Sequence, residues 1–174
     1  MDLDDGHEAG PVADLPEGQP RTRARLAAVQ ALYQMEMTQR DLSLVLQEFL
    51  GRRFETVEIY AGADRQFFRD VVEGVARGQA KIDPEIAGYL ASGWKLSRID
   101  SILRAILRLG VYELTERADV PARAAINEYV EIAKDFFGGE EPGVVNGVLD
   151  RVARTRRPGE FGRKSAGKSG PAKR

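Results

Sequence analysis

The sequence contains no cysteine among its 174 residues. Without thiols the chain has no disulfide bond, no thiolate metal site and no cysteine nucleophile, and such a composition is compatible with a reducing cytoplasm. Its single histidine, His7, lies in an acidic N-terminal segment, so neither a Ser–His pair nor a histidine metal site is expected. Neighbouring carboxylates such as Asp70 and Glu73 fit a solvated helix face. We therefore expect no catalytic residue, no metal and no cofactor.

Long hydrophobic runs are missing as well. No run approaches the ~18 apolar residues that a membrane-spanning helix requires. Residues 1–20 carry six acidic residues and no lysine or arginine, and they lack the hydrophobic centre of a signal peptide. These absences predict a soluble cytoplasmic protein that does not contact a membrane.

The net charge of −1 conceals two oppositely charged ends. Residues 156–174 contain seven basic residues and one acidic residue, which opposes the acidic N-terminal segment. Both ends are rich in glycine, proline and polar residues, so we predict disordered tails over residues 1–20 and 157–174. Residues 21–155 hold 19 basic and 20 acidic residues, so their overall charge does not indicate a nucleic-acid partner.

Apolar residues recur at spacings of three and four throughout the region between the tails, which is typical of amphipathic helices. Clear examples are Leu26-Val29-Tyr33-Met37, Phe67-Phe68-Val71-Val72-Val75, Ile99-Ile102-Ile106-Leu109, Ile126-Tyr129-Val130-Ala133-Phe137 and Val145-Val148-Leu149-Val152. No segment shows the alternation of a β-strand. The pattern predicts an all-α fold, a compact bundle of six or seven helices over residues 21–156. Asp83-Pro84 is expected to begin a short separate helix that ends at Leu90.

Residues 162–169 fit the phosphate-loop pattern G-x-x-x-x-G-K-S. This loop binds nucleotides only where a strand precedes it and a helix follows it, because those elements orient its amide groups around the phosphates. No strand is predicted before Gly162. A Gly/Ser/Lys-rich tail produces this pattern by chance, and we do not expect a nucleotide site.

Three arginines, Arg21, Arg23 and Arg25, lie where the acidic tail gives way to the first helix. A short arginine-rich segment at a flexible helix start can bind phosphates and stack on unpaired bases. Their spacing fits an ordinary solvated helix start equally, and the spacing alone does not decide between the two interpretations.

Four blocks of sequence, in order, resemble the NusB family of transcription antitermination factors. They are Arg23-Ala24-Arg25 with Ala28-Val29-Gln30-Ala31-Leu32-Tyr33-Gln34; Phe68-Arg69-Asp70-Val71-Val72-Glu73-Gly74-Val75; Arg104-Ala105-Ile106-Leu107-Arg108-Leu109 with Tyr112-Glu113-Leu114; and Val120-Pro121, Ala125-Ile126-Asn127-Glu128, Glu131-Ile132-Ala133-Lys134 and Val145-Asn146-Gly147-Val148-Leu149-Asp150. Together they cover roughly residues 21–155, nearly all of the predicted bundle.

The resemblance implies two packed subdomains of the three-helix type. It also implies binding of a boxA-type single-stranded RNA together with the NusE ribosomal protein. The resulting complex joins RNA polymerase and suppresses premature termination during ribosomal RNA transcription. Some relatives form dimers, so a homodimer is an open alternative for this chain.

The resemblance assigns candidate site residues. It places Arg21, Arg23 and Arg25 in the family's RNA-binding segment, and Glu140 in a second region close to the RNA. Tyr33 matches a tyrosine on the surface that binds the protein partner, and Leu103 and Arg104 belong to the same surface. Three residues depart from the family pattern: Leu103 stands where many relatives carry an acid, Thr22 interrupts the arginine run, and Val144 replaces an aromatic residue found in some relatives.

Two other functions are compatible with a helical fold of this kind. A similar fold forms a domain of ribosomal RNA cytosine methyltransferases, but those enzymes need a cysteine nucleophile, which is absent here. The remaining alternative is a helical scaffold that binds only proteins, without specific RNA recognition. A salt-dependent RNA-binding assay separates that alternative from the antitermination factor.

Overall fold

The computed structural model describes residues 19–162, and within this range the protein is helical without any strand. The predicted all-α class is confirmed. The seven α-helical segments are α1 (Gln19–Thr38), α2 (Leu42–Glu48), α3 (Phe54–Thr56), α4 (Arg65–Tyr89), α5 (Ser101–Glu116), α6 (Ala122–Phe136) and α7 (Glu141–Arg156). A π-helical turn (Phe49–Arg53) and two 3-10 turns (Glu58–Tyr60 and Pro158–Glu160) complete the list.

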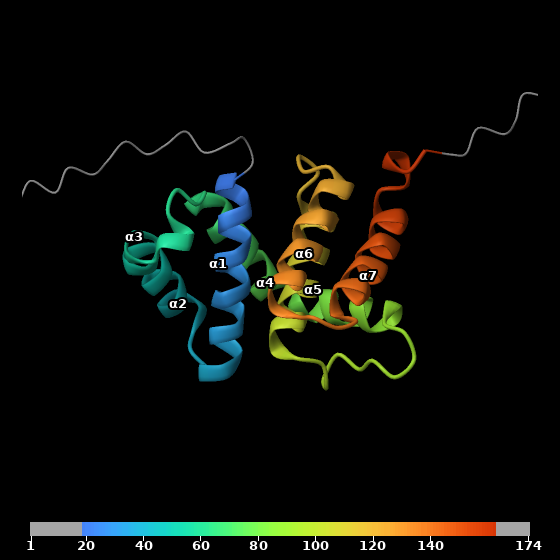
Figure 1. Cartoon of the computed structure of the whole chain (residues 1–174), viewed down its shortest axis with the longest axis horizontal. Helices are drawn as coiled ribbons and strands as arrows, with labels where there is room; N and C mark the ends of the chain where they lie inside the picture. Colours follow the sequence, from blue (N-terminus) through green and yellow to red (C-terminus); the bar gives the residue numbers. More distant parts are fainter. Residues whose placement is uncertain (1–18, 163–174) are drawn as a thin grey trace, which may run out of the picture.

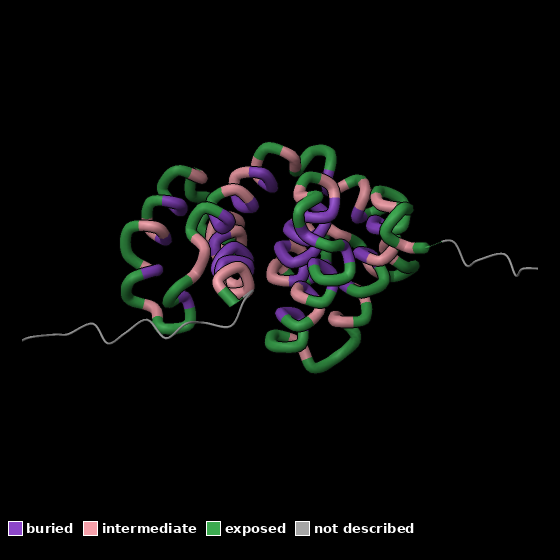
Figure 2. Tube along the Cα trace, turned by 90° about the horizontal axis from the view of Figure 1, so that it is seen from above, coloured by how far each residue is buried: buried purple, intermediate pink, exposed green. Residues whose placement is uncertain are grey.

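The helices form two packed groups, as the family resemblance implied. Figure 1 shows α1, α2 and α3 on one side of the protein and α6 and α7 on the other, while α4 runs from the α1 side across to the α7 side. Viewed end-on in Figure 2, α1 lies between α2–α3 and the α5–α7 group. Helix α5 packs against α1, α4, α6 and α7, so it is the central element that both groups share.

The core explains why α5 is central. Most residues of α5 are buried, including a continuous run from Leu109 to Leu114. The buried faces of α4, α6 and α7 consist mainly of the apolar residues whose spacing predicted those helices. Helix α1 differs: it buries Ala24, Ala27, Ala28, Val29 and Ala31, whereas Tyr33 and Met37 of its predicted stripe are exposed. Within residues 19–162, no helix combines the length and apolar character needed to cross a membrane.

Two glycines allow the helices around α5 to approach closely. A Cβ atom on Gly74 of α4 would lie 2.1 Å from the ring of Tyr112, and one on Gly110 would lie 2.6 Å from a methyl group of Leu149. Real Cβ atoms are essentially never found at such distances, so a larger residue at either position would require Tyr112 or Leu149, or the helices that carry them, to move. The absence of a side chain at both positions leaves room for the ring of Tyr112 against α4 and for Leu149 against α5.

Helix α4 differs from its prediction, because it continues through Pro84 to Tyr89 instead of ending before it. A proline inside a helix removes one backbone hydrogen bond and crowds the preceding turn. Ile82 and Ile86 remain buried on either side of Pro84, so packing of the continuous helix offsets this cost. Asp83, which was expected to cap a new helix, instead binds Arg108 of α5 at 2.8 and 2.9 Å.

The folded region also extends beyond the predicted boundaries of 21 and 156. Helix α1 begins at Gln19, and after α7 the chain forms a 3-10 turn against the protein. Glu160 in this turn accepts a hydrogen bond from the backbone N–H of Ala122 at 2.7 Å. The rest of the two predicted tails, residues 1–18 and 163–174, lies outside the described residues, as does most of the phosphate-loop-like stretch.

Arg157 connects this C-terminal turn to the segment between α5 and α6. Its guanidinium donates to the backbone carbonyls of Glu113, Leu114, Arg117 and Val120, and its side chain is only 9% exposed. Glu113 and Leu114 belong to the last turn of α5, and Arg117 and Val120 follow it. Carbonyls at the C-terminal end of a helix have few donors within the helix, so a donor from outside stabilises this end. The side chain of Arg157 therefore caps α5 from another part of the chain.

We expect Arg157→Ala to lower the free energy of unfolding by about 2–3 kcal/mol, because several carbonyls lose a charged donor. Urea denaturation followed by circular dichroism measures this change. Arg156→Ala is the matched control: Arg156 is 53% exposed and pairs only with Glu85, so its loss should cost less than about 1 kcal/mol. Equal stability of the two variants would contradict the capping role of Arg157.

Candidate functional site

The start of α1, which carries the three predicted arginines, is hydrogen-bonded to the segment before α4 and to α6. The backbone carbonyl of Pro20 accepts from the N–H of Asp64 at 2.9 Å, and Arg23 donates to the carbonyl of Ala61 at 2.6 Å. Thr22 also donates to Glu128 of α6 at 3.0 Å. The expectation of a flexible, frayed helix start is therefore wrong for residues 19–25.

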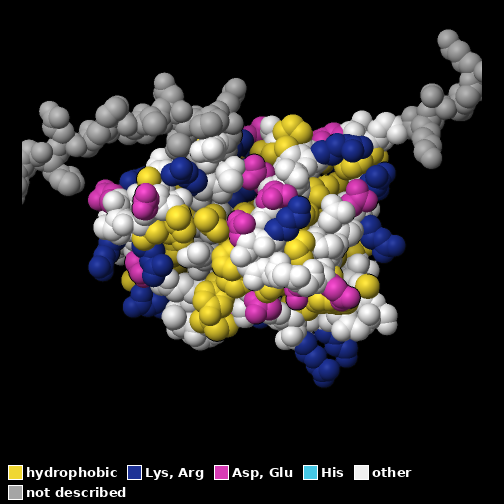
Figure 3. All heavy atoms as spheres, in the orientation of Figure 1, with side chains coloured by type: hydrophobic (Ala, Val, Ile, Leu, Met, Phe, Trp, Pro, Cys, Tyr) yellow, Lys and Arg dark blue, Asp and Glu magenta, His cyan; other side chains and the backbone are white. Residues whose placement is uncertain are grey.

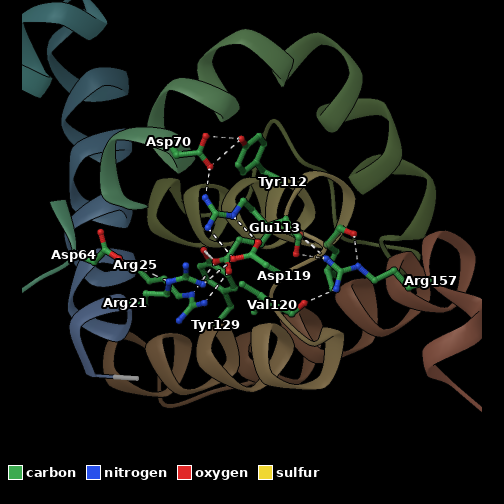
Figure 4. Close-up of polar contacts among 12 residues, drawn as sticks. Arg21, Arg25, Asp64, Asp70, Tyr112, Glu113, Asp119, Val120, Tyr129 and Arg157 are labelled. Atoms are coloured by element: carbon green, nitrogen blue, oxygen red, sulfur yellow. Dashed lines mark hydrogen bonds and ion pairs between the residues drawn. The ribbon is translucent and has the colours of Figure 1, made fainter. Parts of the chain in front are cut away.

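Arg25 is buried, which corrects the prediction that it lies on an RNA-binding surface. Its residue exposure is 3%, and its guanidinium forms two hydrogen bonds of 2.8 Å with the fully buried carboxylate of Glu113 on α5. Tyr129 of α6 donates its hydroxyl to the same carboxylate. Figure 4 shows these side chains meeting between the three helices. The side chain of Arg25 therefore lies in the interior of the protein.

The pKa values of this cluster follow from its burial. Burial alone would lower the pKa of Arg25, but the hydrogen bond to Glu113 and the negative charges of Glu113 and Glu128 raise it overall. Burial, followed by the charge of Glu113, raises the pKa of Tyr129 well above its usual value. Near neutral pH, Arg25 is therefore protonated and Tyr129 is neutral.

The ring of Phe67, in the first turn of α4, is contacted by three arginines. The guanidinium carbons of Arg21, Arg25 and Arg117 lie 4.8, 4.9 and 5.0 Å from the ring centroid. Such cation–π contacts contribute about 0.5–2 kcal/mol each, depending on burial. Asp64 caps α4 by accepting from the N–H of Phe67 at 2.9 Å, which fixes the ring beside α1.

Arg21 remains at the surface and contacts acidic residues there. Its guanidinium donates to Asp119 at 3.1 Å and lies 3.8 Å from Asp64, and its side chain is 36% exposed. Arg117 binds the same Asp119 carboxylate through two hydrogen bonds of 3.0 Å. The hydrogen bond from Arg117 is the main reason that the pKa of Asp119 is lowered to about 2, so Asp119 stays ionised at physiological pH.

Glu140 is exposed and lies at the start of α7, away from these arginines. Asp119 precedes the first turn of α6, whereas Glu140 follows its last turn. The 15 residues of α6 separate the two positions by roughly 22 Å of helix. The structure therefore does not bring Glu140 together with Arg21 and Arg23, and the two predicted RNA-binding regions lie at opposite ends of α6.

The predicted partner surface contains an exposed apolar face on α1. Tyr33 is 40% exposed and Met37, one turn later, is 51% exposed, with Leu44 of α2 nearby in the sequence at 51%. Figure 3 shows hydrophobic side chains gathered over α1 and α2 on the face drawn there. Large apolar side chains that remain in water at adjacent helix positions are typical of protein-binding surfaces.

A groove of about 870 Å³ lies beside this face, between α1, α4, α5 and the segment that joins α4 to α5. Glu36, one turn after Tyr33, forms its charged wall by pairing with Arg104 and Arg108 of α5. Trp94 and Leu96 are part of its lining. The groove thus has apolar walls and one charged wall, in which the negative charge of Glu36 offsets part of the positive charge of Arg104 and Arg108.

The two α5 residues predicted at the partner surface differ in exposure. Arg104 lines the groove with a side chain that is 12% exposed, and it binds Glu36 and the carbonyls of Leu96 and Ile99. Leu103 is fully buried, which corrects the expectation that it lies on the partner surface. Its side chain points into the core because α5 is enclosed by helices on most sides.

Comparison with known proteins shows which family the chain belongs to. Residues 22–154 match the model of the NusB family. The transcription antitermination protein NusB of Caulobacter vibrioides is 54% identical over 142 residues, covering 80% of this chain and 95% of that protein. The chain belongs to the NusB family.

Solved NusB structures share the fold. The T. maritima NusB structure superposes with a TM-score of 0.70 at 33% identity, covering 82% of this chain and 96% of that one. A structure of the antitermination factors NusB and NusE in complex with double-stranded RNA has a TM-score of 0.66 at 22% identity, covering 79% and 98% of the respective chains. At that lower identity the second comparison establishes the shared fold.

Sequence reasoning missed several residues of the site. Asp119, which binds two arginines, was not among the predicted site residues. Arg117, Phe67 and Glu36 were not singled out for the site at all. The only available signal was indirect: Glu36 lies three residues from Tyr33, and Arg117 lies two residues from Asp119. Within residues 19–162, no group of three or more His, Cys, Asp or Glu side chains is arranged to hold a metal ion.

We expect Arg25→Met to lower the free energy of unfolding by about 3–5 kcal/mol, because Glu113 would keep a buried charge without its cation. Urea denaturation measures the loss. Adding Glu113→Gln removes that charge but keeps an acceptor for Tyr129, so the double variant should recover a large part of the stability. If Arg25→Met were as stable as the parent protein, the pair would not be structural, and a surface role for Arg25 would return.

Proposed function

We propose that this chain is a transcription antitermination factor that binds a boxA-type single-stranded RNA together with the NusE ribosomal protein. The observation that carries the proposal is its membership of the NusB family over residues 22–154. An exposed arginine segment and an exposed apolar face on the same helix support it, because they offer separate surfaces for RNA and for protein.

The proposed RNA-binding surface is the start of α1, with Arg21 and Arg23 as its cations. Both are half-buried, and each is held by a hydrogen bond that leaves part of its guanidinium in solvent. A planar guanidinium binds phosphate oxygens through paired N–H groups. Glu140 stays a second proposed contact at the other end of α6, which an extended strand could reach, since single-strand sites occupy roughly 4–16 nucleotides per domain.

The proposed NusE-binding surface is the apolar face of α1 with the adjoining groove. Tyr33 and Met37 supply exposed apolar area, and Arg104 lies in the groove wall beside Glu36. Because Arg104 and Arg108 are already paired with Glu36 and Asp83, burial of this part of the wall does not leave either arginine as an uncompensated charge. A protein partner is therefore better suited to this surface than RNA.

Three further expectations belong to the same proposal. The complex with RNA and NusE acts on RNA polymerase during ribosomal RNA transcription, which places the protein in the cytoplasm. A homodimer stays a prediction.

The alternative function is a scaffold that binds only proteins. In that case the arginines at the start of α1 would have no RNA to bind.

Arg21→Ala with Arg23→Ala should weaken binding of boxA-like RNA at least tenfold, or about 1.4 kcal/mol, because two phosphate contacts are lost. Fluorescence anisotropy with boxA-like and scrambled RNA, at several salt concentrations and with and without NusE, measures the effect. Arg25 is left unchanged so that the fold is preserved.

The control for this experiment is Arg52→Ala with Arg151→Ala, which removes two exposed cations elsewhere on the protein. Its RNA affinity should stay close to that of the parent protein. Equal affinity of the parent for boxA-like and scrambled RNA in the presence of NusE would favour the scaffold function instead.

Tyr33→Ala with Met37→Ala should weaken NusE binding at least tenfold, about 1.4 kcal/mol, since both side chains would lose apolar burial in the complex. Isothermal titration calorimetry with purified NusE measures this affinity. Ile59→Ala is the control, because Ile59 is as exposed as Met37 but lies in the 3-10 turn before α4. Unchanged affinity in the double variant would place the partner on another face.

A further inference from the structure

We propose that Phe161, together with Arg123 and Arg154, forms a further contact for single-stranded RNA, which we call the Phe161 site. A base stacks on the exposed part of the Phe161 ring, and the two arginines bind phosphates. The proposal rests on the RNA-binding function argued above. It adds a site that uses the segment after α7, which the sequence had assigned to a disordered tail.

The segment after α7 holds Phe161 against the start of α6. Glu160 accepts a hydrogen bond from the backbone N–H of Ala122 at 2.7 Å and another from Arg157 at 3.1 Å. The next residues of the two segments therefore meet, and the guanidinium carbon of Arg123 lies 5.4 Å from the centroid of the Phe161 ring. Phe161 packs against the core but is only half-buried. Its ring is thus held in place with part of its surface in solvent.

Two arginines from different helices meet at this ring. Arg154 of α7 places its guanidinium carbon 4.8 Å from the ring centroid, and its side chain is 58% exposed. Arg154 also pairs with Asp150 at 2.9 Å, whereas no acidic residue within residues 19–162 forms an ion pair with the exposed Arg123. A guanidinium without a carboxylate partner keeps its N–H groups available for phosphate oxygens. Arg123 is therefore the stronger phosphate contact of the two.

A half-buried aromatic ring between guanidiniums has the chemistry of a site for unpaired bases. Bases of a single strand stack on aromatic rings and on guanidinium planes, and this stacking tolerates any sequence. The charge of the chain beyond Phe161 fits the same ligand, because residues 163–174 contain five basic and no acidic residues. A protein partner fits less well, since the exposed large apolar side chains of residues 19–162 lie on α1, α2, the end of α6 and the 3-10 turn before α4.

The Phe161 site lies at the same end of the protein as the start of α1. Figure 1 shows that α1 and α6 begin, and α7 ends, at this end. Figure 3 shows basic side chains near the end of α7 on the face drawn there. Arg21 of α1 binds Asp119, which lies only four residues before Arg123. A single strand bound at Arg21 therefore has only the start of α6 to cross before it reaches Phe161.

The test measures fluorescence anisotropy of the full chain with boxA-like and scrambled single-stranded RNA of equal length, at several salt concentrations. Phe161→Leu keeps an apolar side chain against the protein but removes the stacking surface. It should weaken binding of both RNAs about fivefold or more, which corresponds to the lower end of base–aromatic stacking. Phe161→Trp keeps an aromatic surface and should retain the parental affinity. Neither variant should change the salt dependence, because the ring carries no charge.

Arg123→Ala tests the phosphate contact separately. It should weaken binding of both RNAs about threefold or more at low salt, and it should reduce the slope of log affinity against log salt by about 0.7, the contribution of one phosphate contact to a single strand. Arg151→Ala is the matched control, because Arg151 is an exposed cation of α7 that likewise has no ion pair within residues 19–162. It should leave affinity and slope nearly unchanged. Circular dichroism and urea denaturation verify that every variant is folded.

The outcomes separate this inference from the proposed function. Neither stacking nor a phosphate contact reads the base sequence, so both losses should appear on both RNAs even if the parent does not discriminate between them. Equal affinity of the parent for the two RNAs would then count against boxA recognition and leave the Phe161 site supported. A folded Phe161→Leu or Arg123→Ala variant that binds RNA as tightly as the parent would overturn the Phe161 site. Weaker NusE binding by Phe161→Leu, with unchanged RNA affinity, would also overturn it, because a protein would then occupy this surface.

Discussion

Inside the protein, Arg25 of α1 binds Glu113 of α5, and Tyr129 of α6 donates to the same carboxylate. This buried contact joins the two helix groups, because α1 belongs to one and α5 and α6 belong to the other. A charge pair removed from water is stabilising only when its remaining hydrogen-bonding capacity is satisfied, and here Tyr129 and the second guanidinium bond meet that condition. The pair thereby fixes how α1 is rotated against its neighbours.

That rotation decides which arginines reach the surface. With Arg25 turned inward, Arg21 lies one turn earlier at the edge of the same face, over the ring of Phe67. Arg23 lies on another side of the helix and contacts the carbonyl of Ala61. The proposed RNA-binding surface is therefore a consequence of the internal ion pair, and three arginines that look equivalent in the sequence have three different environments.

The sequence predicted the features that depend on local periodicity. The apolar stripes identified α1, α4, α5, α6 and α7. Pro84 misled the prediction because the packing of Ile82 and Ile86, which a local rule does not include, keeps α4 continuous. The helical class and the family needed only patterns of this local kind.

The site was less predictable, because its interactions join residues far apart in the chain. The spacing of the arginines did not reveal that Arg25 turns toward Glu113, 88 residues away in the chain. Leu103 was assigned to a surface from resemblance alone, and the enclosure of α5 places it in the core. Neither Asp119 nor Arg117 stood out until the fold brought them to Phe67 and Arg21.

The position of Arg157 has a consequence for the nascent chain. The residue that caps α5 follows all seven α-helical segments, so it leaves the ribosome after every one of them. Until then the carbonyls of Glu113, Leu114, Arg117 and Val120 lack the guanidinium donor of Arg157, and the segment with Arg117 and Asp119 lacks this anchor. The surface at the start of α1 therefore reaches its final form only as translation of the last helix is completed, although α1 itself is made first.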